Sequence, residues 1–406
     1  MNIFRFLFLL SVLSIPGCRR QMPVSGNWTG TMTTGENKQI PFQFFLEPGS
    51  PGPAGYFING PERTPIPEIQ IQQDSLTFFF SEYGAAMRGT WDGSTWRGKF
   101  FRYRSDTSWN AFVATPTSEG REPAPAAIPS GLSLSGKFQV YLPGDHGTDS
   151  TTTAIFWMRH DSLFGTLIAP DGDYGLLAGT QTGSHVSLSR FTGWQAFLLE
   201  LDRQDTHWTG RLAARSGKPM VFTLGAQPAV PSTQAPSSET SMKNPKAPLK
   251  FWGMTSSGRM MNSDDELLRK KVLVIDIMGT WCHNCMDAAP LLQQLYHEFG
   301  KDGLVVVGLS FEISGNPETA KKNLALFQAR YGLTYPVLFC GSTDKMNVQQ
   351  RLHSQLNGFS GYPTTIFTDR NSIVKRIHIG FDGPGTGEGY QHQVGQYYEI
   401  VKKLLK

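Results

Sequence analysis

The chain has 406 residues, with 17% charged and 12% aromatic residues, 43 glycines, 26 prolines and a net charge of +4. This length exceeds what one ordinary hydrophobic core supports, so we expect two or three domains that are turn-rich and in part β-rich. The small net charge, without a dense Lys/Arg tract, argues against a nucleic-acid-binding protein.

The first 17 residues are predicted to be a lipoprotein signal peptide. Arg5 precedes a mostly apolar run from Phe6 to Ile15, which is too short to cross a bilayer comfortably and suits a signal segment. The end of this run, Ile-Pro-Gly-Cys with Cys18 last, resembles a bacterial lipobox, in which the cysteine becomes lipidated. The alternative is an ordinary secretory signal cut nearby. Both readings predict an exported, periplasm-facing protein of a bacterial envelope, and the first adds a membrane anchor on Cys18.

Two β-rich units are expected in the front half, at about residues 25–117 and 130–225. Short alternating runs of Phe, Thr, Val and Trp are separated there by Gly, Pro, Asp and Asn, which is typical of strands and turns. The pattern also repeats at an offset of 110 to 112 residues, with "SGNW" at 25 and "SGKF" at 135, and "WRGKF" at 96 and "WTGRL" at 208. Each unit has room for about eight strands of ordinary length, as a barrel or a sandwich.

Four tryptophans of these units are candidates either for ligand contacts at a barrel mouth or for core positions, and aromatic residues favour the core. They are Trp28, Trp96, Trp194 and Trp208. The histidines of this half lack metal-ligand spacing, so no metal site is predicted. A structural role or the docking of a partner is the expected role of this half of the chain.

Residues 226–249 are rich in Pro, Ser, Ala and Thr and predict a linker. From residue 250 to 406 the pattern changes to alternating strands and helices, beginning with the apolar strand "KVLVIDIMG" at 271–279 and closing with a helix that includes "YQHQVGQYYEIVKKLL". This order predicts an α/β domain with a central mixed sheet and helices on both faces.

The stretch "TWCHNC", residues 280–285, follows that strand and opens a helix. This arrangement resembles the thioredoxin superfamily. Pro290 in the following helix and "GYPTTIF" at 361–367 fit the resemblance, and the long segment between them, together with export, is similar to the TlpA/ResA-like disulfide oxidoreductases. The resemblance covers about residues 250–406, and we do not recognise a family in the front half. One departure is Ala288, three residues after the second cysteine, where several such reductases carry Glu.

The resemblance implies a catalytic set of Cys282, Cys285, Asp276 and Pro363. Cys282 would attack as a thiolate at a helix N-terminus, and Cys285 would resolve the mixed disulfide. Asp276, on an apolar strand, would exchange a proton with Cys285 through water, or be buried for structure alone. Pro363 is expected in cis, presenting neighbouring backbone to a substrate.

Four further residues are expected near the dithiol: Trp281, His283, Asn284 and Tyr362. A charged His283 beside Cys282 would make the pair more oxidising, although the enzymes with such a histidine usually carry it where Asn284 stands. Trp281 and Tyr362 would form contact surface, or pack. Cys340, which ends a predicted buried strand, is expected to be an inert core thiol.

We therefore expect an exported, membrane-anchored protein disulfide oxidoreductase without a cofactor, acting on protein thiols and supplied by a membrane electron donor. Reduction, as in cytochrome c maturation, is the leading direction, and an oxidase or isomerase is the alternative. A surface binder of glycans or apolar ligands through residues 25–225 is a different class of alternative. A thiol peroxidase is disfavoured because the P-x-x-x-T-x-x-C pattern is missing.

Overall fold

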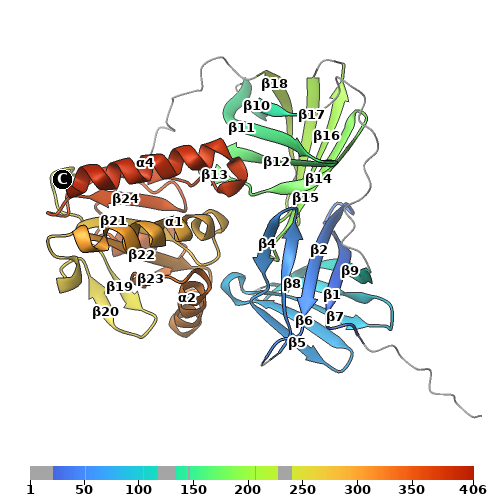
Figure 1. Cartoon of the computed structure of the whole chain (residues 1–406), viewed down its shortest axis with the longest axis horizontal. Coiled ribbons are helices and arrows are strands. Elements are labelled where there is room, and N and C mark those ends of the chain that lie inside the picture. Colours follow the sequence, from blue (N-terminus) through green and yellow to red (C-terminus); the bar gives the residue numbers. More distant parts are fainter. Residues whose placement is uncertain are drawn as a thin grey trace, which may run out of the picture.

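The computed structural model describes residues 22–50, 52–103, 105–117, 134–144, 147–205, 207–226 and 240–406. Two β units lie together on one side of an α/β domain, with unit 2 above unit 1 in the view of Figure 1. The predicted signal peptide and Cys18 lie outside the described residues. Among the helices of the described part, none is both long enough and apolar enough to cross a membrane.

Unit 1 is a nine-stranded antiparallel sheet in the order β4-β3-β2-β1-β9-β8-β7-β6-β5. Its second strand shows why the sheet forms: Ile40, Phe42, Phe44 and Leu46 alternate with more exposed residues and bury one face. The elements are β1 (Gly26–Thr33), β2 (Gln39–Glu47), β3 (Ala54–Asn59), β4 (Glu62–Pro65), β5 (Glu68–Gln72), β6 (Ser75–Phe80), the short helix η1 (Ser81–Tyr83), β7 (Ala85–Trp91), β8 (Trp96–Arg102) and β9 (Ser105–Thr117).

Unit 2 has the strand order β11-β10-β18-β17-β16-β15-β14-β12-β13, and β11 also pairs with β12, so the sheet closes into a barrel. The closure depends on the pairing of β12 with β14, whereas in unit 1 the order ends at β5. Each unit thus has nine strands where about eight were expected. The strands are β10 (Gly136–Gly144), β11 (Gly147–Arg159), β12 (Ser162–Ala169), β13 (Gly172–Asp173), β14 (Leu177–Thr182), β15 (His185–Phe191), β16 (Ala196–Gln204), β17 (His207–Ala214) and β18 (Met220–Ala226).

Three of the four tryptophans considered as ligand contacts are core residues: Trp28, Trp96 and Trp208 are at most 8% exposed. Trp194 is half-buried and stacks on Tyr83 of unit 1, with ring centroids 5.2 Å apart. The core interpretation is therefore right for three of them, and the fourth joins the two units.

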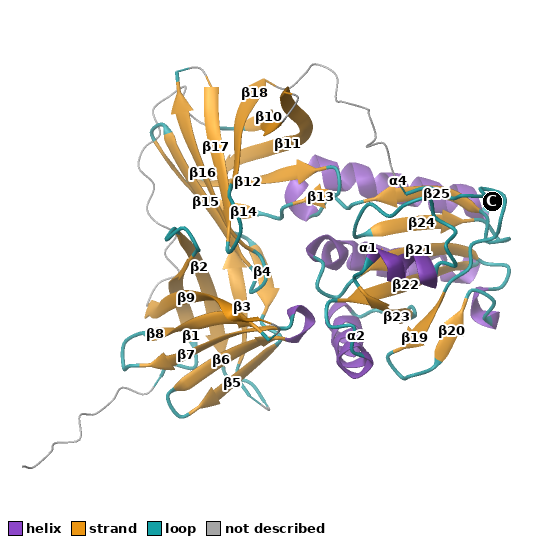
Figure 2. Cartoon of the chain, turned by 180° about the vertical axis from the view of Figure 1, so that it is seen from behind, coloured by secondary structure: helices purple, strands orange, loops and turns teal. Residues whose placement is uncertain are grey.

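The C-terminal domain has a seven-stranded mixed sheet in the order β20-β19-β23-β22-β21-β24-β25. Figure 2 shows its helices around this sheet. The strands are β19 (Trp252–Thr255), β20 (Met260–Asn262), β21 (Val272–Met278), β22 (Leu304–Glu312), β23 (Val337–Ser342), β24 (Thr364–Thr368) and β25 (Val374–Ile379). The α-helices are α1 (His283–Phe299), α2 (Pro317–Tyr331), α3 (Lys345–Arg351) and α4 (Glu388–Leu405), and the short helices are η2 (Glu266–Leu268), η3 (Gly300–Asp302) and η4 (Pro384–Thr386).

Strand β21 separates two hydrophobic cores. Val274 and Met278 pack in the cluster that contains the helices α1, α2 and α4, whereas Ile275 and Ile277 pack in the cluster on the opposite face, with α3. This alternation follows from the period of two along a strand. The α/β architecture with helices on both faces is confirmed.

The end of the predicted linker belongs structurally to the C-terminal domain. Thr240 is 1% exposed and its hydroxyl donates to Ser360, and the amide of Lys243 donates to the carbonyl of Gln355. Residues 240–249 therefore pack against the domain instead of extending away from it.

Candidate functional site

The two cysteines of the motif form a disulfide at the start of α1. Cys282 is the N-cap residue, and its sulfur accepts a hydrogen bond from the backbone N–H of Cys285 at 3.3 Å. The free amides and dipole at a helix N-terminus favour a thiolate at Cys282 once the disulfide is reduced. Cys282 is 6% and Cys285 is 1% exposed, so the first sulfur is the more accessible of the two.

The segment before the dithiol is fixed by Glu312 at the end of β22. This carboxylate is fully buried and accepts from the backbone N–H and hydroxyl of Thr280 at 3.1 and 2.7 Å. The indole of Trp281 donates to the carbonyl of Phe311 at 2.8 Å. Both contacts join the motif to β22, so the approach to Cys282 is held by the sheet.

The Tyr362–Pro363 peptide bond is cis, as the resemblance implied. The ring of Tyr362 meets that of Trp281 edge to face, with centroids 5.4 Å apart. These two aromatic side chains therefore pack on each other next to Cys282, and Tyr362 also lines the cavity beside that residue.

Asp276 lies in β21 and is 2% exposed. Its side chain faces the same side of the sheet as Val274 and Met278, in whose cluster Cys285 packs. The hydroxyl of Thr365 donates a hydrogen bond to Asp276 at 3.3 Å, and burial raises the pKa of Asp276 to about 7. A carboxyl group with this pKa changes protonation near neutral pH, which suits proton exchange with a thiol.

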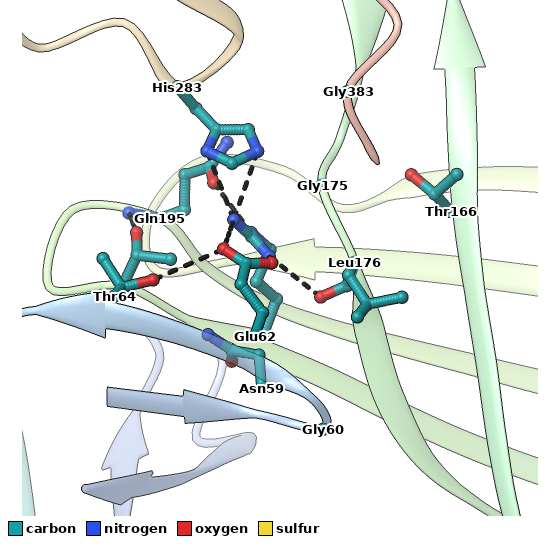
Figure 3. Close-up of polar contacts among 12 residues, drawn as sticks. Asn59, Gly60, Glu62, Thr64, Thr166, Gly175, Leu176, Gln195, His283 and Gly383 are labelled. Atoms are coloured by element: carbon teal, nitrogen blue, oxygen red, sulfur yellow. Dashed lines mark hydrogen bonds and ion pairs between the residues drawn. The ribbon is translucent and has the colours of Figure 1, made fainter. Parts of the chain in front are cut away.

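His283 follows Cys282 and contacts charges on both sides. Its Nε2 lies 3.1 Å from Oδ2 of Asp287, one turn further along α1. Nη2 of Arg190, in β15 of unit 2, lies 3.2 Å from both ring nitrogens. Arg190 also forms a two-pronged ion pair with Glu62 of unit 1, at 2.6 and 2.9 Å, and Figure 3 shows Glu62 and His283 close together at this junction.

Burial opposes charge on His283, but Asp287 more than offsets it, so that the pKa of His283 is raised above its usual value. Burial likewise opposes charge on Glu62, and the adjacent Arg190 lowers the pKa of Glu62 overall. The junction of the three parts of the chain is therefore a row of charged groups that ends beside the dithiol.

Asn284 binds the backbone of unit 2. With its amide oriented to satisfy both partners, it donates to the carbonyl of Asp173 at 3.1 Å and accepts from the N–H of Asp173 at 3.2 Å. The carboxylate of Asp173 in turn accepts from the backbone N–H of Gly383 at 3.0 Å. The turn between β12 and β13 is thus fastened to the C-terminal domain at two points.

This turn, residues 170–174, borders the cavity beside Cys282 and is called the cap turn below. Asp171, Gly172 and Tyr174 line a cavity of about 230 Å³ together with Cys282 and Tyr362. A larger cavity of about 640 Å³ borders the same helix and is lined by all three parts of the chain, among them Glu62, His283 and Tyr390.

The structure brings most of the predicted site together. Trp281, Cys282, His283, Asn284 and Tyr362 line one cavity, while Cys285 and Asp276 are buried side chains. Their catalytic and tuning roles remain predictions. Cys340 is fully buried and burial raises the pKa of its thiol to about 12, so it fits the inert core thiol that was expected.

Sequence reasoning missed four residues: Glu62, Asp173, Arg190 and Glu312. The first three come from the β units, and nothing in a local pattern indicates which side chain of a distant unit will meet the motif. Glu312 carried a usable signal, because a carboxylate at the end of an otherwise apolar strand is costly to bury without a purpose.

Comparisons with known proteins agree with this geometry. The model of the AhpC/TSA family matches residues 244–377. The thioredoxin-like protein YneN of Bacillus subtilis is 29% identical over 31% of this chain and 65% of its own length. The thiol-disulfide oxidoreductase ResA of Geobacillus thermodenitrificans is 28% identical over 33% of this chain and 65% of its own length. The chain thus covers just under two thirds of each relative.

Among solved structures, a putative thiol:disulfide interchange protein DsbE from Chlorobium tepidum is 21% identical, with a TM-score of 0.30, and covers 39% of this chain and 94% of that one. The C-terminal region of this protein is a thioredoxin-like domain that matches the AhpC/TSA family model and is similar to bacterial thiol-disulfide oxidoreductases.

Proposed function

We propose that this protein catalyses dithiol-disulfide exchange on protein substrates through Cys282 and Cys285. The observation that carries the proposal is the bonded pair at the start of α1, with the sulfur of Cys282 on the amide of Cys285. In the reduced protein, the Cys282 thiolate attacks a substrate disulfide and one substrate sulfur leaves as a thiol. Cys285 then loses its proton and attacks the Cys282 sulfur, which releases the second substrate thiol and restores the internal disulfide.

Asp276 is the proposed acceptor of the Cys285 proton. Its pKa of about 7 and its place on the face of β21 that carries Val274 and Met278, in whose cluster Cys285 packs, support this role. We further propose that the protein is an exported lipoprotein anchored through Cys18, and that a membrane electron donor returns two electrons per cycle. Similarity to ResA proteins supports reduction as the direction, and a place in cytochrome c maturation is one assignment within it.

Oxidation or isomerisation is the second candidate, favoured by the charged surroundings of His283. A cation beside Cys282 stabilises the thiolate and makes a dithiol more oxidising. The reduction potential of the couple separates the two candidates. A value near or below about −250 mV supports a reductase, and a value between about −120 and −180 mV supports an oxidase or isomerase.

The test of the exchange reaction is dithiothreitol-dependent reduction of insulin by the whole chain. Wild type should accelerate precipitation of the insulin B chain, and Cys282→Ser should abolish the acceleration. Cys340→Ser is the matched control, because that thiol is buried and is not part of the disulfide, and it should retain activity. Activity that survives in Cys282→Ser would overturn the proposal.

A further inference from the structure

Arg190 is an unusual residue for a β unit with no recognised chemistry, because its charged side chain is fully buried. Burying a guanidinium group is costly unless its donors are all satisfied. Four of its five N–H donors are satisfied: Glu62 accepts two hydrogen bonds, the side chain of Gln195 accepts one at 2.9 Å and the carbonyl of Leu176 accepts another at 3.0 Å. The group is therefore held in one orientation.

That orientation places the guanidinium against His283. The charged groups that face this histidine come from four elements: Glu62 from β4, Asp173 from β13, Arg190 from β15 and Asp287 from α1. None of the first three belongs to the redox domain. The charge beside Cys282 thus depends on both β units.

We propose that Arg190 is a positioning residue that raises the reduction potential of the Cys282/Cys285 couple through its charge beside His283, and that Glu62 moderates this effect. The inference rests on the proposed exchange reaction. Reduction consumes two electrons and one proton and leaves Cys282 as thiolate and Cys285 as thiol, with a dithiol or glutathione as the electron source. A nearby cation stabilises the thiolate product, and a nearby carboxylate destabilises it.

The two partners therefore predict shifts of opposite sign. Arg190→Gln leaves the Glu62 carboxylate without its counter-charge, so the disulfide should be favoured by about tenfold, which is about 30 mV towards more negative potential. Glu62→Gln leaves the guanidinium uncompensated and should shift the equilibrium the other way. The double variant removes both charges and should return to near the wild-type value, as should Arg190→Lys, which keeps the charge.

The measurement is the reduced fraction of the whole chain in glutathione buffers, read by alkylation and gel shift. Lys38→Gln is the matched control, because Lys38 pairs with Glu200 at 3.0 Å and also joins the two β units, but through partly exposed side chains. Shifts of the same sign in both single variants, or no shift in either, would overturn the inference. A chain that shows no Cys282-dependent redox couple would instead overturn the proposed exchange reaction.

A separate observation concerns access to Cys282. The cap turn lies against the loop of the cis peptide, since a Cβ on Gly361 would stand 3.8 Å from Cβ of Asp171 and one on Gly380 would stand 2.7 Å from the carbonyl carbon of Asp171. Cys282 is 6% exposed, and the cap turn lines the cavity beside it. We also infer that the cap turn is an autoinhibitory contact that a protein substrate must displace, whereas small thiol reagents enter the 230 Å³ cavity.

Gly172 offers a test, because a Cβ there would overlap the side chain of Asn284 and push the turn outward. The rates are measured for Cys282 in a Cys285→Ser background and each is divided by the rate of a free thiol with the same reagent. The normalised rate should be far higher with iodoacetamide than with a large polyethylene glycol maleimide. Gly172→Leu, or the milder Gly172→Ala, should raise the relative rate of the large reagent. Gly183→Leu is the control, since Gly183 also has positive φ, lies in another turn of unit 2, and has no atom within 4 Å of its Cβ position.

Two results would overturn the inference that the turn restricts access. In one, the ratio of the rates with the small and the large reagent equals that of a free thiol. In the other, Gly172→Leu leaves this ratio unchanged.

Discussion

Replacing Asp276 with Asn should stabilise the protein, and the gain should grow with pH. Burial raises the pKa of Asp276 from 3.8 to about 7, so between these values the folded protein holds a proton that the unfolded chain has lost. Stability of the wild type therefore falls as pH rises through this range and levels off above it. The folded and unfolded pKa values differ by about 3, which lowers the free energy of unfolding of the wild type by about 4 kcal/mol once Asp276 is ionised in both states. About 3 kcal/mol of this loss should occur between about pH 5 and pH 8.

Asn carries no titrating proton and can still accept the hydrogen bond from Thr365. The free energy of unfolding of oxidised wild type and Asp276→Asn, measured by urea denaturation across this pH range, should diverge by the amount stated. Asp302→Asn, at an exposed position of the same domain, should show no such divergence. A stability difference for Asp276→Asn that stays constant with pH would refute the assignment of a buried, protonated carboxyl group.

Three further predictions concern the surroundings of the dithiol. His283 has a raised pKa and pairs with Asp287, so its contribution to stability is present below its ordinary pKa and is lost as pH rises through the raised value. The stability gap between wild type and His283→Gln should therefore be larger near about pH 6 than near about pH 9, and a gap independent of pH would contradict this. Glu312→Gln should lower the free energy of unfolding by about 1–3 kcal/mol, because charge-assisted hydrogen bonds to Thr280 are weakened, and an unchanged urea midpoint would exclude that anchoring role. Cys340→Ser should leave the rate of thiol modification of the native reduced protein unchanged, since burial raises the pKa of this thiol to about 12, whereas loss of a fast phase in this variant would show that Cys340 is reactive.

Much of the architecture could be predicted from the sequence because the side-chain periods differ between its parts. The alternation in β2 and the apolar runs of β21 and β22 identify strands, and "TWCHNC" marks the turn into α1. The short strands β19 and β20 were missed, because three or four residues are too few to show a period.

The environment of the site could not be predicted in the same way. Arg190 and His283 are 93 residues apart and Glu62 and Arg190 are 128 apart, so their meeting depends on how the three parts of the chain pack together. Composition suggested an extended linker up to residue 249, whereas Leu249 is 1% exposed and packs in the core of the C-terminal domain. Local patterns specify elements, and packing between units decides which polar groups surround the dithiol.

The contacts between the β units and the C-terminal domain also shape the surroundings of the dithiol. Tyr83 of η1 donates to the sulfur of Met286 in α1 at 3.9 Å, and residues of unit 1 share one continuous hydrophobic cluster with the C-terminal domain. The same contacts that stabilise the assembly bring Glu62 and Arg190 to His283 and the cap turn to the cavity beside Cys282. The β units thus become candidates for setting both the potential and the access of the dithiol.

Trapping of the mixed disulfide tests the central claim most directly. Cys285→Ser, incubated with a peptide disulfide and analysed by mass spectrometry after proteolysis, should accumulate a peptide linked to Cys282. Cys282→Ser should accumulate none on Cys285, because that sulfur is 1% exposed and lies behind the first. A linked peptide on Cys285, or none in either variant, would contradict dithiol-disulfide exchange led by Cys282.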